Sequence, residues 1–312
     1  MSELAYVNGV FGPIAEAKIS VNDRGFQFGD GIYEVVAVYE GRPFLLDRHM
    51  ARFRTSAQAI HLNYDFDQKP LEPIVFEGLR RCGIRDAIVY MQITRGIAAR
   101  SHVIPPDLTP TVVMTFRPLP RVPDEQRRRG ARLMTTRDTR WEHCYIKAIT
   151  LLPNTLDRSR AVWKGFDDAL YISESGEIME STSSNLFLVH GDTVQLPPRT
   201  EAILHGITQG FLIECAESIG LRVAERACPL DLLWSADEAF MSSTTIEVLG
   251  VTSVDHRPIG SGSVGPITQR MHDAYRARIP QHLTDPNIPL SPRERAGVRA
   301  EASPISPRER AG

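Results

Sequence analysis

The chain has 312 residues, of which 42% are hydrophobic and 24% are charged, a composition typical of a soluble globular protein with about two domains. Its longest apolar runs fall far short of the roughly 18 to 20 residues that span a bilayer, which excludes a helical membrane protein. With 36 basic and 38 acidic residues the net charge is -2, so the composition predicts binding to neither nucleic acid nor a membrane surface.

The first 120 residues are predicted to alternate short strands with two helices. Runs of β-branched and aromatic residues indicate the strands, and Asn-Gly, Gly-Asp-Gly and Glu-Gly sequences indicate turns. Asp47 is expected to cap the first helix, because apolar residues then recur at three- and four-residue steps from Met50 to Ile60. The predicted elements are strands within 6–42, a hairpin turn at 40–41, helices after 47 and over 71–82, and strands over 87–94 and 111–116.

A proline-rich segment, 118–125, lies between two stretches that resemble strands. Closely spaced prolines are typical of a linker. We therefore predict a small N-terminal α/β domain at 1–120, a linker at 121–130 and a larger C-terminal domain at 131–282. The elements predicted for the second domain are strands over 131–135, 168–173, 185–189 and 238–242, and helices over 154–164, 207–218 and 267–279.

The tail, 283–312, differs in composition from the rest of the chain. It is rich in proline, has almost no large apolar side chains and contains the heptapeptide Ser-Pro-Arg-Glu-Arg-Ala-Gly twice, at 291–297 and 306–312. Two copies cannot stack into a solenoid. We predict a disordered appendage, with a docking peptide as the less favoured alternative.

The four cysteines form no C-x-x-C pair and no close cysteine and histidine spacing. Reduced thiols are therefore expected, and no metal site is predicted. The N-terminal sequence lacks a basic stretch followed by an apolar one, as a secretory signal would have. Together these features predict a cytoplasmic protein.

Lysine is scarce: the 36 basic residues include 32 arginines and only four lysines, Lys18, Lys69, Lys147 and Lys164. Arginine-rich codon usage is sufficient to explain the bias. Lys147 differs from the other three because it stands alone in an apolar run, 145–152. Such a lysine either extends to solvent or is desolvated, and desolvation lowers its pKa and makes the amine a nucleophile.

Two segments could bind phosphate. Gly206-Ile207-Thr208 opens an apolar helix, so the free N-H groups of Ile207 and Thr208 and the Thr208 hydroxyl could hold a phosphate at the positive end of the helix dipole. Residues 242–245 form a second hydroxyl-rich turn. Each pattern alone is usually only a cap or a turn, and Arg52 could add a positive charge.

Glu180 stands before a run of small hydroxyl side chains that leads into a strand. A carboxylate at the entrance of a buried strand requires a cationic or N-H partner. Glu180 is therefore a candidate for a functional acid.

The sequence resembles the fold-type IV pyridoxal-phosphate enzymes over residues 5–274, and among them the D-amino-acid aminotransferases more than the branched-chain aminotransferases or the aminodeoxychorismate lyases. The resemblance implies an α/β (α+β) fold of two domains, in which the smaller N-terminal domain is α/β and the larger C-terminal domain is mixed α/β and barrel-like. The segments that carry it are 23–34 (DRGFQFGDGIYE), the pair His49 and Arg52, the run around Lys147, 180–185 (ESTSSN), 204–208 (LHGIT) and 243–245 (STT).

The resemblance also implies pyridoxal 5'-phosphate as cofactor and assigns a role to each candidate. Lys147 would form the internal aldimine and transfer the substrate proton, and Glu180 would pair with the pyridine nitrogen. Leu204 would pack on the ring. The groups that would hold the phosphate are Arg52, Ile207, Thr208 and Thr244.

Substrate recognition is assigned to Tyr33 and to the Arg-x-His motif of Arg100 and His102. Arg100 and His102 are two residues apart, so in an extended loop both side chains can reach one carboxylate. The arginine can bind it through two hydrogen bonds. Without the resemblance a solvated loop is the preferred interpretation. In the D-amino-acid aminotransferases, which the sequence resembles, this motif acts across a dimer interface, so the resemblance implies a homodimer.

The predicted function is transamination between D-amino acids, such as D-alanine, and 2-oxo acids, such as 2-oxoglutarate. Alternatives within the fold are a branched-chain L-amino-acid aminotransferase, an (R)-amine transaminase and an aminodeoxychorismate lyase. The non-enzymatic alternative, a scaffold acting through the tail, does not explain a lone lysine accompanied by an acid and a phosphate site.

Overall fold

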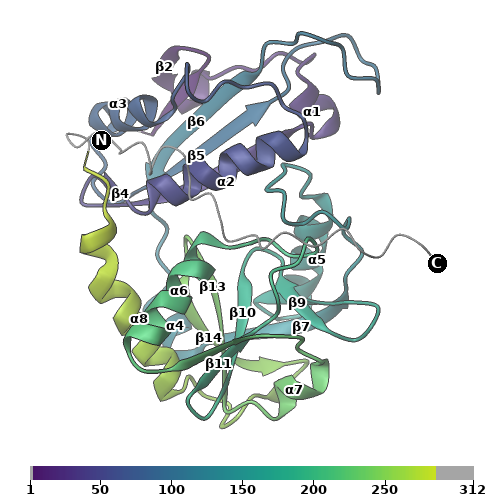
Figure 1. Cartoon of the computed structure of the whole chain (residues 1–312), viewed down its shortest axis with the longest axis vertical. Helices are drawn as coiled ribbons and strands as arrows, with labels where there is room; N and C mark the ends of the chain where they lie inside the picture. The colour runs from purple at the N-terminus through teal and green to yellow at the C-terminus, as the bar shows by residue number, and fades with distance from the viewer. Residues whose placement is uncertain (1–2, 286–312) are drawn as a thin grey trace, which may run out of the picture.

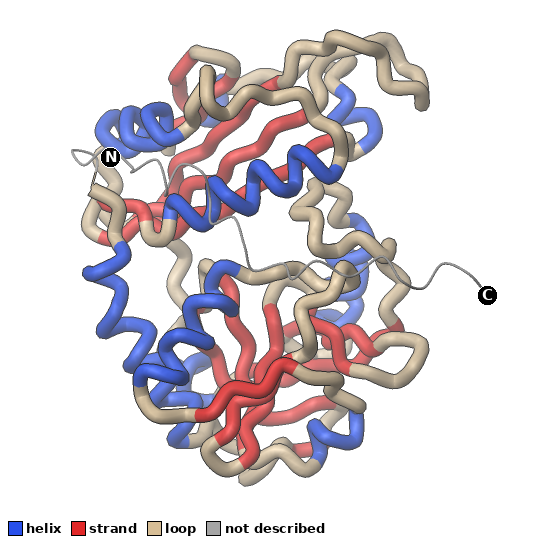
Figure 2. Tube along the Cα trace, viewed as in Figure 1, coloured by secondary structure: helices blue, strands red, loops and turns tan. Residues whose placement is uncertain are grey.

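The computed structural model describes residues 3–285, whose strands form two separate sheets (Figures 1 and 2). The first sheet has the order β2-β1-β6-β5-β3-β4 and is antiparallel throughout. Its strands are β1 (Leu4–Val7), β2 (Val10–Pro13), β3 (Gly31–Tyr39), β4 (Arg42–Pro43), β5 (Ala87–Thr94) and β6 (Thr111–Pro118).

Two helices, α2 (Leu46–Ala59) and α3 (Glu72–Cys82), pack against this sheet and enclose its core. Phe53 of α2 and Phe116 of β6 are fully buried in the cluster, as expected for apolar residues that face a sheet from one side of a helix. Alternate residues of β5 are buried against it. A 3-10 turn η1 (Ile14–Glu16) and a short helix α1 (Arg24–Phe28) complete this half.

The second sheet has the order β12-β11-β10-β13-β14-β7-β8-β9, with β15 added beside β14. Parallel pairs, such as β7 with β8, occur beside antiparallel ones, and β9 at one end of the order contacts β10, so the sheet curls on itself. Its strands are β7 (Ala131–Arg137), β8 (Asp168–Ile172), β9 (Ile178–Ser181), β10 (Asn185–His190), β11 (Thr193–Leu196), β12 (Arg222–Glu225), β13 (Glu238–Ser243), β14 (Glu247–Val254) and β15 (Arg257–Pro258).

Helices cover this sheet on both sides and join it to the first one. Helices α6 and α8 share a core with Tyr39 and Phe44 of the N-terminal half, and α8 runs along the side of the molecule toward β4 (Figure 1). The remaining bounds are α4 (Asp124–Arg129), α5 (Leu152–Trp163), α6 (Ile207–Ser218), α7 (Leu230–Trp234), α8 (Pro266–Arg278) and η2 (Ile279–His282).

The predicted fold class is confirmed, and most predicted elements lie within two residues of their observed bounds. The break between the sheets falls between Pro118 and Ala131; the domain limits themselves stay a prediction. The predicted linker, 121–130, is largely helical, because α4 occupies residues 124–129 of it. The prediction omitted α1, α7, β9, β11, β12 and β14.

Two local predictions are wrong. Asp47 does not cap α2; the N-cap is Leu45, in a left-handed conformation with φ 52°, and Asp47 lies in the first turn, where its charge favours the helix dipole. The predicted tail begins too early, because Leu283 bridges to Phe44 and the Thr284 N-H donates to the Pro43 carbonyl. The rest of the predicted tail, 286–312, lies outside the described residues.

Candidate functional site

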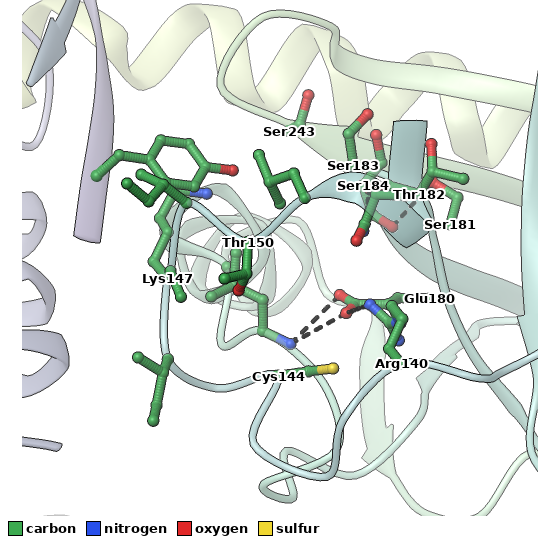
Figure 3. Close-up of a pocket in the computed structure, with 18 of the residues that line it drawn as sticks. Arg140, Cys144, Lys147, Thr150, Glu180, Ser181, Thr182, Ser183, Ser184 and Ser243 are labelled. Atoms are coloured by element: carbon green, nitrogen blue, oxygen red, sulfur yellow. Dashed lines mark hydrogen bonds and ion pairs between the residues drawn. The ribbon is translucent and has the colours of Figure 1, made fainter. Parts of the chain in front are cut away.

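A cavity of about 620 Å³ lies between the two sheets and draws its lining from both. The first half contributes Tyr33 and Arg52, and the second contributes Glu180 and its neighbours. The irregular segment between β7 and α5, which carries Lys147, closes a third side (Figure 3). Eight of the ten candidate residues line this cavity: Tyr33, Arg52, Lys147, Glu180, Leu204, Ile207, Thr208 and Thr244.

Lys147 is held by its backbone at the edge of β3. Its carbonyl accepts a hydrogen bond from the Tyr33 N-H (2.9 Å), and its own N-H donates to Ser56 Oγ (3.1 Å). The side chain is half-buried, and Nζ lies 4.3 Å from the centre of the Tyr33 ring. The amine therefore faces the cavity beside an aromatic ring, which attracts a cation.

Glu180, on β9, is a buried carboxylate with three donors around it. Arg140 approaches Oε1 at 2.7 Å, and Asn185 donates to Oε2 at 3.1 Å. The Leu204 N-H lies 3.3 Å from both oxygens. Burial raises the pKa of Glu180 above its ordinary value, and the ion pair with Arg140 opposes that rise.

Arg140 is a cavity residue that the sequence analysis did not identify. It is buried and binds two carboxylates, Asp138 through Nη2 at 2.8 Å and Glu180 through Nη1, while its guanidinium stacks 4.1 Å above the Tyr171 ring. Figure 3 shows it beside Glu180 at the cavity wall. No sequence signal singles it out, because it is one of 32 arginines and its partner is 40 positions away.

Arg52 is oriented by a second buried carboxylate that the sequence analysis did not assign, Glu34. Arg52 Nε donates to Glu34 Oε1 (2.7 Å) and Nη2 to Oε2 (2.9 Å), and His49 Nδ1 lies 2.7 Å from Oε2. Burial acts to raise the pKa of Glu34, but the charges and hydrogen bonds of Arg52 and His49 bring it well below 4.5. Nη1 donates to the His205 carbonyl (2.9 Å), and the guanidinium so held is part of the cavity lining.

The predicted phosphate segments meet at the cavity wall. Helix α6 begins at Ile207, as predicted, and its first-turn N-H groups have no partner within the helix. A Cβ on Gly206 would lie 2.1 Å from Asn185 Oδ1, so this close approach requires glycine. Ser242 Oγ is buried without a hydrogen-bond partner in the part of the chain that the structure describes, and both Ser242 and Thr244 line the same cavity.

Arg100 and His102 do not line the cavity of their own chain. Both are exposed and converge on Phe28: the guanidinium lies 4.6 Å above the ring and the imidazole meets it edge-on at 5.6 Å. Phe28 itself is part of the cavity lining. The two side chains therefore share one face, as their spacing predicts, but point past the cavity of this chain.

The sequence matches the model of amino-transferase class IV over residues 31–254. It is 37% identical to the D-alanine aminotransferase of Bacillus licheniformis over 272 residues, 87% of this chain and 95% of that protein. It is also 35% identical to the D-alanine aminotransferase of Staphylococcus aureus (strain MSSA476) over 282 residues. That match covers 90% of this chain and 99% of that protein.

Among solved structures, the fold is similar to that of a branched-chain amino acid aminotransferase from T.th., solved with pyridoxamine 5'-phosphate. The TM-score is 0.84 at 29% identity, and the match covers 91% of this chain and 98% of that one.

The cavity has the chemistry that pyridoxal phosphate requires. Lys147 offers an amine, Glu180 offers a carboxylate that can hold a proton on the ring nitrogen, and the start of α6 offers N-H donors for a phosphate. The unpartnered Ser242 hydroxyl is a further donor on the same wall.

Glu34→Gln is expected to lower the free energy of unfolding by about 3 to 5 kcal/mol near neutral pH, because Arg52 and His49 lose a buried partner. Since folding lowers the pKa of Glu34 below 4.5, its stabilisation is complete above that value and is lost as pH falls toward the lowered pKa. Urea unfolding of wild type and variant between about pH 7 and pH 3.5 should therefore show a difference that shrinks on acidification. Glu16→Gln, at an exposed position in η1, is the control, and a Glu34 difference independent of pH would contradict the assignment.

Arg140→Met is expected to destabilise the protein by about 3 to 5 kcal/mol near neutral pH, because Glu180 loses its buried counter-ion. The pKa of Glu180, already raised by burial, should rise further. A carboxyl that binds its proton more tightly when folded makes the protein more stable as pH falls, so acidification should reduce the defect. The double variant Arg140→Met/Glu180→Gln should recover much of the loss in urea unfolding.

Arg158→Met is the matched control for Arg140→Met, because Arg158 is exposed and donates a hydrogen bond to a hydroxyl of the cavity wall, Ser183, instead of binding Glu180. It should leave stability nearly unchanged at every pH. A defect in Arg140→Met that grows on acidification, or that Glu180→Gln does not relieve, would refute the proposed coupling.

Proposed function

Because the chain belongs to amino-transferase class IV and is a pyridoxal-phosphate-dependent aminotransferase, we propose that it exchanges amino groups between D-amino acids, D-alanine among them, and 2-oxo acids such as 2-oxoglutarate. The observation that carries the proposal is the meeting of Lys147, Glu180 and the phosphate-binding segments in one cavity. The similarity to two D-alanine aminotransferases supports the choice of D-amino acids.

The bound cofactor would supply an aldehyde that condenses with amines and a ring that accepts electrons. Lys147 would hold the cofactor covalently through Nζ and, once released, would move the proton of the substrate carbon. Glu180, whose charged form the ion pair with Arg140 favours, would hold a proton at the ring nitrogen. Leu204 would pack on the ring.

The phosphate would be held by Arg52, by the N-H groups of Ile207 and Thr208, and by the hydroxyl of Thr244. The start of α6 gives this group the positive end of a helix dipole. Glu34 would fix the direction of the Arg52 fork, since it occupies Nε and one side of Nη2. A phosphate held from several sides orients the rest of the cofactor toward Lys147.

Recognition of the substrate carboxylate is assigned to Tyr33 of the same chain and to Arg100 and His102 of a second copy. Tyr33 lies beside Lys147 in the cavity. Arg100 and His102 point past their own cavity, so a homodimer would place them over the cavity of the partner. Exposed apolar side chains around this loop and near the cavity favour such contact: Phe26, Ile97, Val103, Trp141 and Leu152.

We place the protein in the cytoplasm because the described cysteines, Cys82, Cys144, Cys215 and Cys228, are all free thiols, as expected in a reducing compartment. Among residues 3–285, no helix has the length and apolarity needed to cross a membrane. Amino acids and 2-oxo acids are its proposed small-molecule partners.

The main alternative is transamination of branched-chain L-amino acids, which the similarity to the branched-chain amino acid aminotransferase favours. The two candidate functions differ in the stereochemistry of the donor. The exposed Arg-x-His motif favours a trap for the carboxylate of D-amino acids, and a donor without a carboxylate should not depend on it.

The purified protein with pyridoxal phosphate is expected to convert D-alanine and 2-oxoglutarate to pyruvate, measured by coupled reduction of pyruvate. Lys147→Ala should abolish turnover and covalent retention of the cofactor after borohydride treatment, because it removes the amine. Lys164→Ala, at the end of α5, is the control and should retain both. Turnover of L-leucine or L-valine without turnover of D-alanine would favour the alternative.

Arg100→Ala is expected to lower kcat/KM for D-alanine by about 10- to 100-fold, because a charged hydrogen bond to the carboxylate is lost. Mixing Arg100→Ala with the inactive Lys147→Ala should restore activity if Arg100 acts on the partner, since one cavity of each mixed dimer then has both residues. If Arg100 acted within its own chain, no mixed dimer would have an intact site and mixing would restore nothing.

A further inference from the structure

The turn that carries Thr244 has an unusual backbone. Ser243 at the end of β13 pairs with Glu247 at the start of β14, so residues 244–246 form a three-residue hairpin turn. Glu247 follows the turn with φ 60°, in the left-handed region. Three-residue hairpins commonly place glycine there, because a Cβ is unfavourable in this conformation. A glutamate at this position needs a compensating interaction.

The compensating interaction is a cluster of hydrogen-bonding side chains around the buried Glu247 carboxylate. Oε1 accepts hydrogen bonds from the Tyr39 hydroxyl (2.9 Å) and from Arg276 (2.8 Å), and His272 Nε2 lies 2.9 Å from Oε2. Burial acts to raise the pKa of Glu247, but hydrogen bonds from His272 and Tyr39 and the charge of Arg276 lower it to about 2. The carboxylate is therefore anchored in its charged form.

The anchor connects three elements that meet behind the turn. Tyr39 ends β3 of the first sheet, while His272 and Arg276 lie on one face of α8. A second cavity, of about 540 Å³, lies behind the turn and includes Thr245, Glu247 and Tyr39 in its wall. Ile246 packs against the core of the second sheet on one side of the turn. On the side of the cavity close packing is absent, and there the side chain of Glu247 ties the turn to β3 and α8.

We propose that Glu247 is a positioning residue for the cofactor phosphate: its anchored side chain holds the hairpin in the conformation that places Thr244 at the cavity wall. The inference rests on the proposed function, in which Thr244 binds the phosphate. Glu247 does not line the main cavity and acts through the turn. Its loss should therefore weaken binding of the phosphate group and leave binding of the pyridine ring unchanged.

The test compares the affinity of the apoprotein for pyridoxal 5'-phosphate and for pyridoxal, which lacks the phosphate. Both are measured by the absorbance change on binding. Glu247→Ala is expected to weaken pyridoxal phosphate binding at least about tenfold, and to change pyridoxal binding less than about twofold. Equal weakening of both ligands, or no weakening of either, would overturn the inference.

A second variant, Glu247→Gly, separates the side-chain anchor from backbone strain. Glycine suits the left-handed conformation but has no carboxylate, so it should show the same selective loss as alanine. Recovery of wild-type affinity in Glu247→Gly would show that conformation alone matters and would overturn the anchor. Tyr39→Phe, which removes one of the three donors and leaves no large cavity, should cause a smaller loss that is again confined to pyridoxal phosphate.

Glu40→Ala is the matched control, because Glu40 is also a glutamate in the left-handed region, φ 53°, in the turn between β3 and β4. It should leave both affinities unchanged, and a selective loss there would overturn the assignment to Glu247. Failure of the proposed function is distinguishable: wild type would then show no preference for pyridoxal phosphate over pyridoxal.

Discussion

The pairing of the segment around Lys147 with the edge of β3 is the constraint on which the site depends. After β7 the chain leaves the second sheet, and the Tyr33 N-H binds the Lys147 carbonyl while the Ile149 N-H binds the Gly31 carbonyl. These hydrogen bonds satisfy backbone groups on the edge of β3 that β4 does not reach. They also fix Lys147 to the first half of the molecule, although the elements before and after it in the chain, β7 and α5, belong to the second.

Lys147 is fixed on the side of the cavity formed by the first sheet, and the acidic residue comes from the second sheet. Glu180 lies on β9, in the curled end of the second sheet, and reaches the same cavity. The cavity therefore exists only while the two halves are joined. The core shared by β3, α6 and α8, and the cluster around Glu247, hold that junction together. The hydrogen bond between Tyr39 and Glu247 links residues 208 positions apart, so the site is a product of the complete fold.

Buried carboxylates paired with arginine are the recurring electrostatic device of the site. Glu34 accepts two hydrogen bonds from Arg52 and also contacts His49, and its pKa is lowered. Glu180 accepts one hydrogen bond from Arg140, and Arg140 also binds Asp138. The effect of burial on Glu180 therefore outweighs that of the ion pair, and its pKa is raised. The difference suits their proposed uses: Glu34 is a fixed charge that orients Arg52, whereas Glu180 faces a group with which it would share a proton.

The sequence by itself determined most of the local structure and the identity of the principal candidates. Periodicity and turn residues predicted α3, α6 and the main strands, and the isolation of Lys147 in an apolar run identified the amine. The motifs around Glu180 and Thr208 were found because the groups of each motif are adjacent in the chain. Asp47 was wrongly assigned as a cap because the N-cap is two residues earlier, at a left-handed Leu45.

Only the tertiary structure decided the partners of these groups. Arg140, Glu34 and Glu247 pair with residues 40, 18 and 208 positions away, and no local pattern marks one arginine or glutamate among many. It also decided that Arg100 and His102 point past their own cavity. Propensity and periodicity reflect interactions between near neighbours, whereas ion pairs and cavity walls depend on how distant segments pack, which the order of residues alone does not specify.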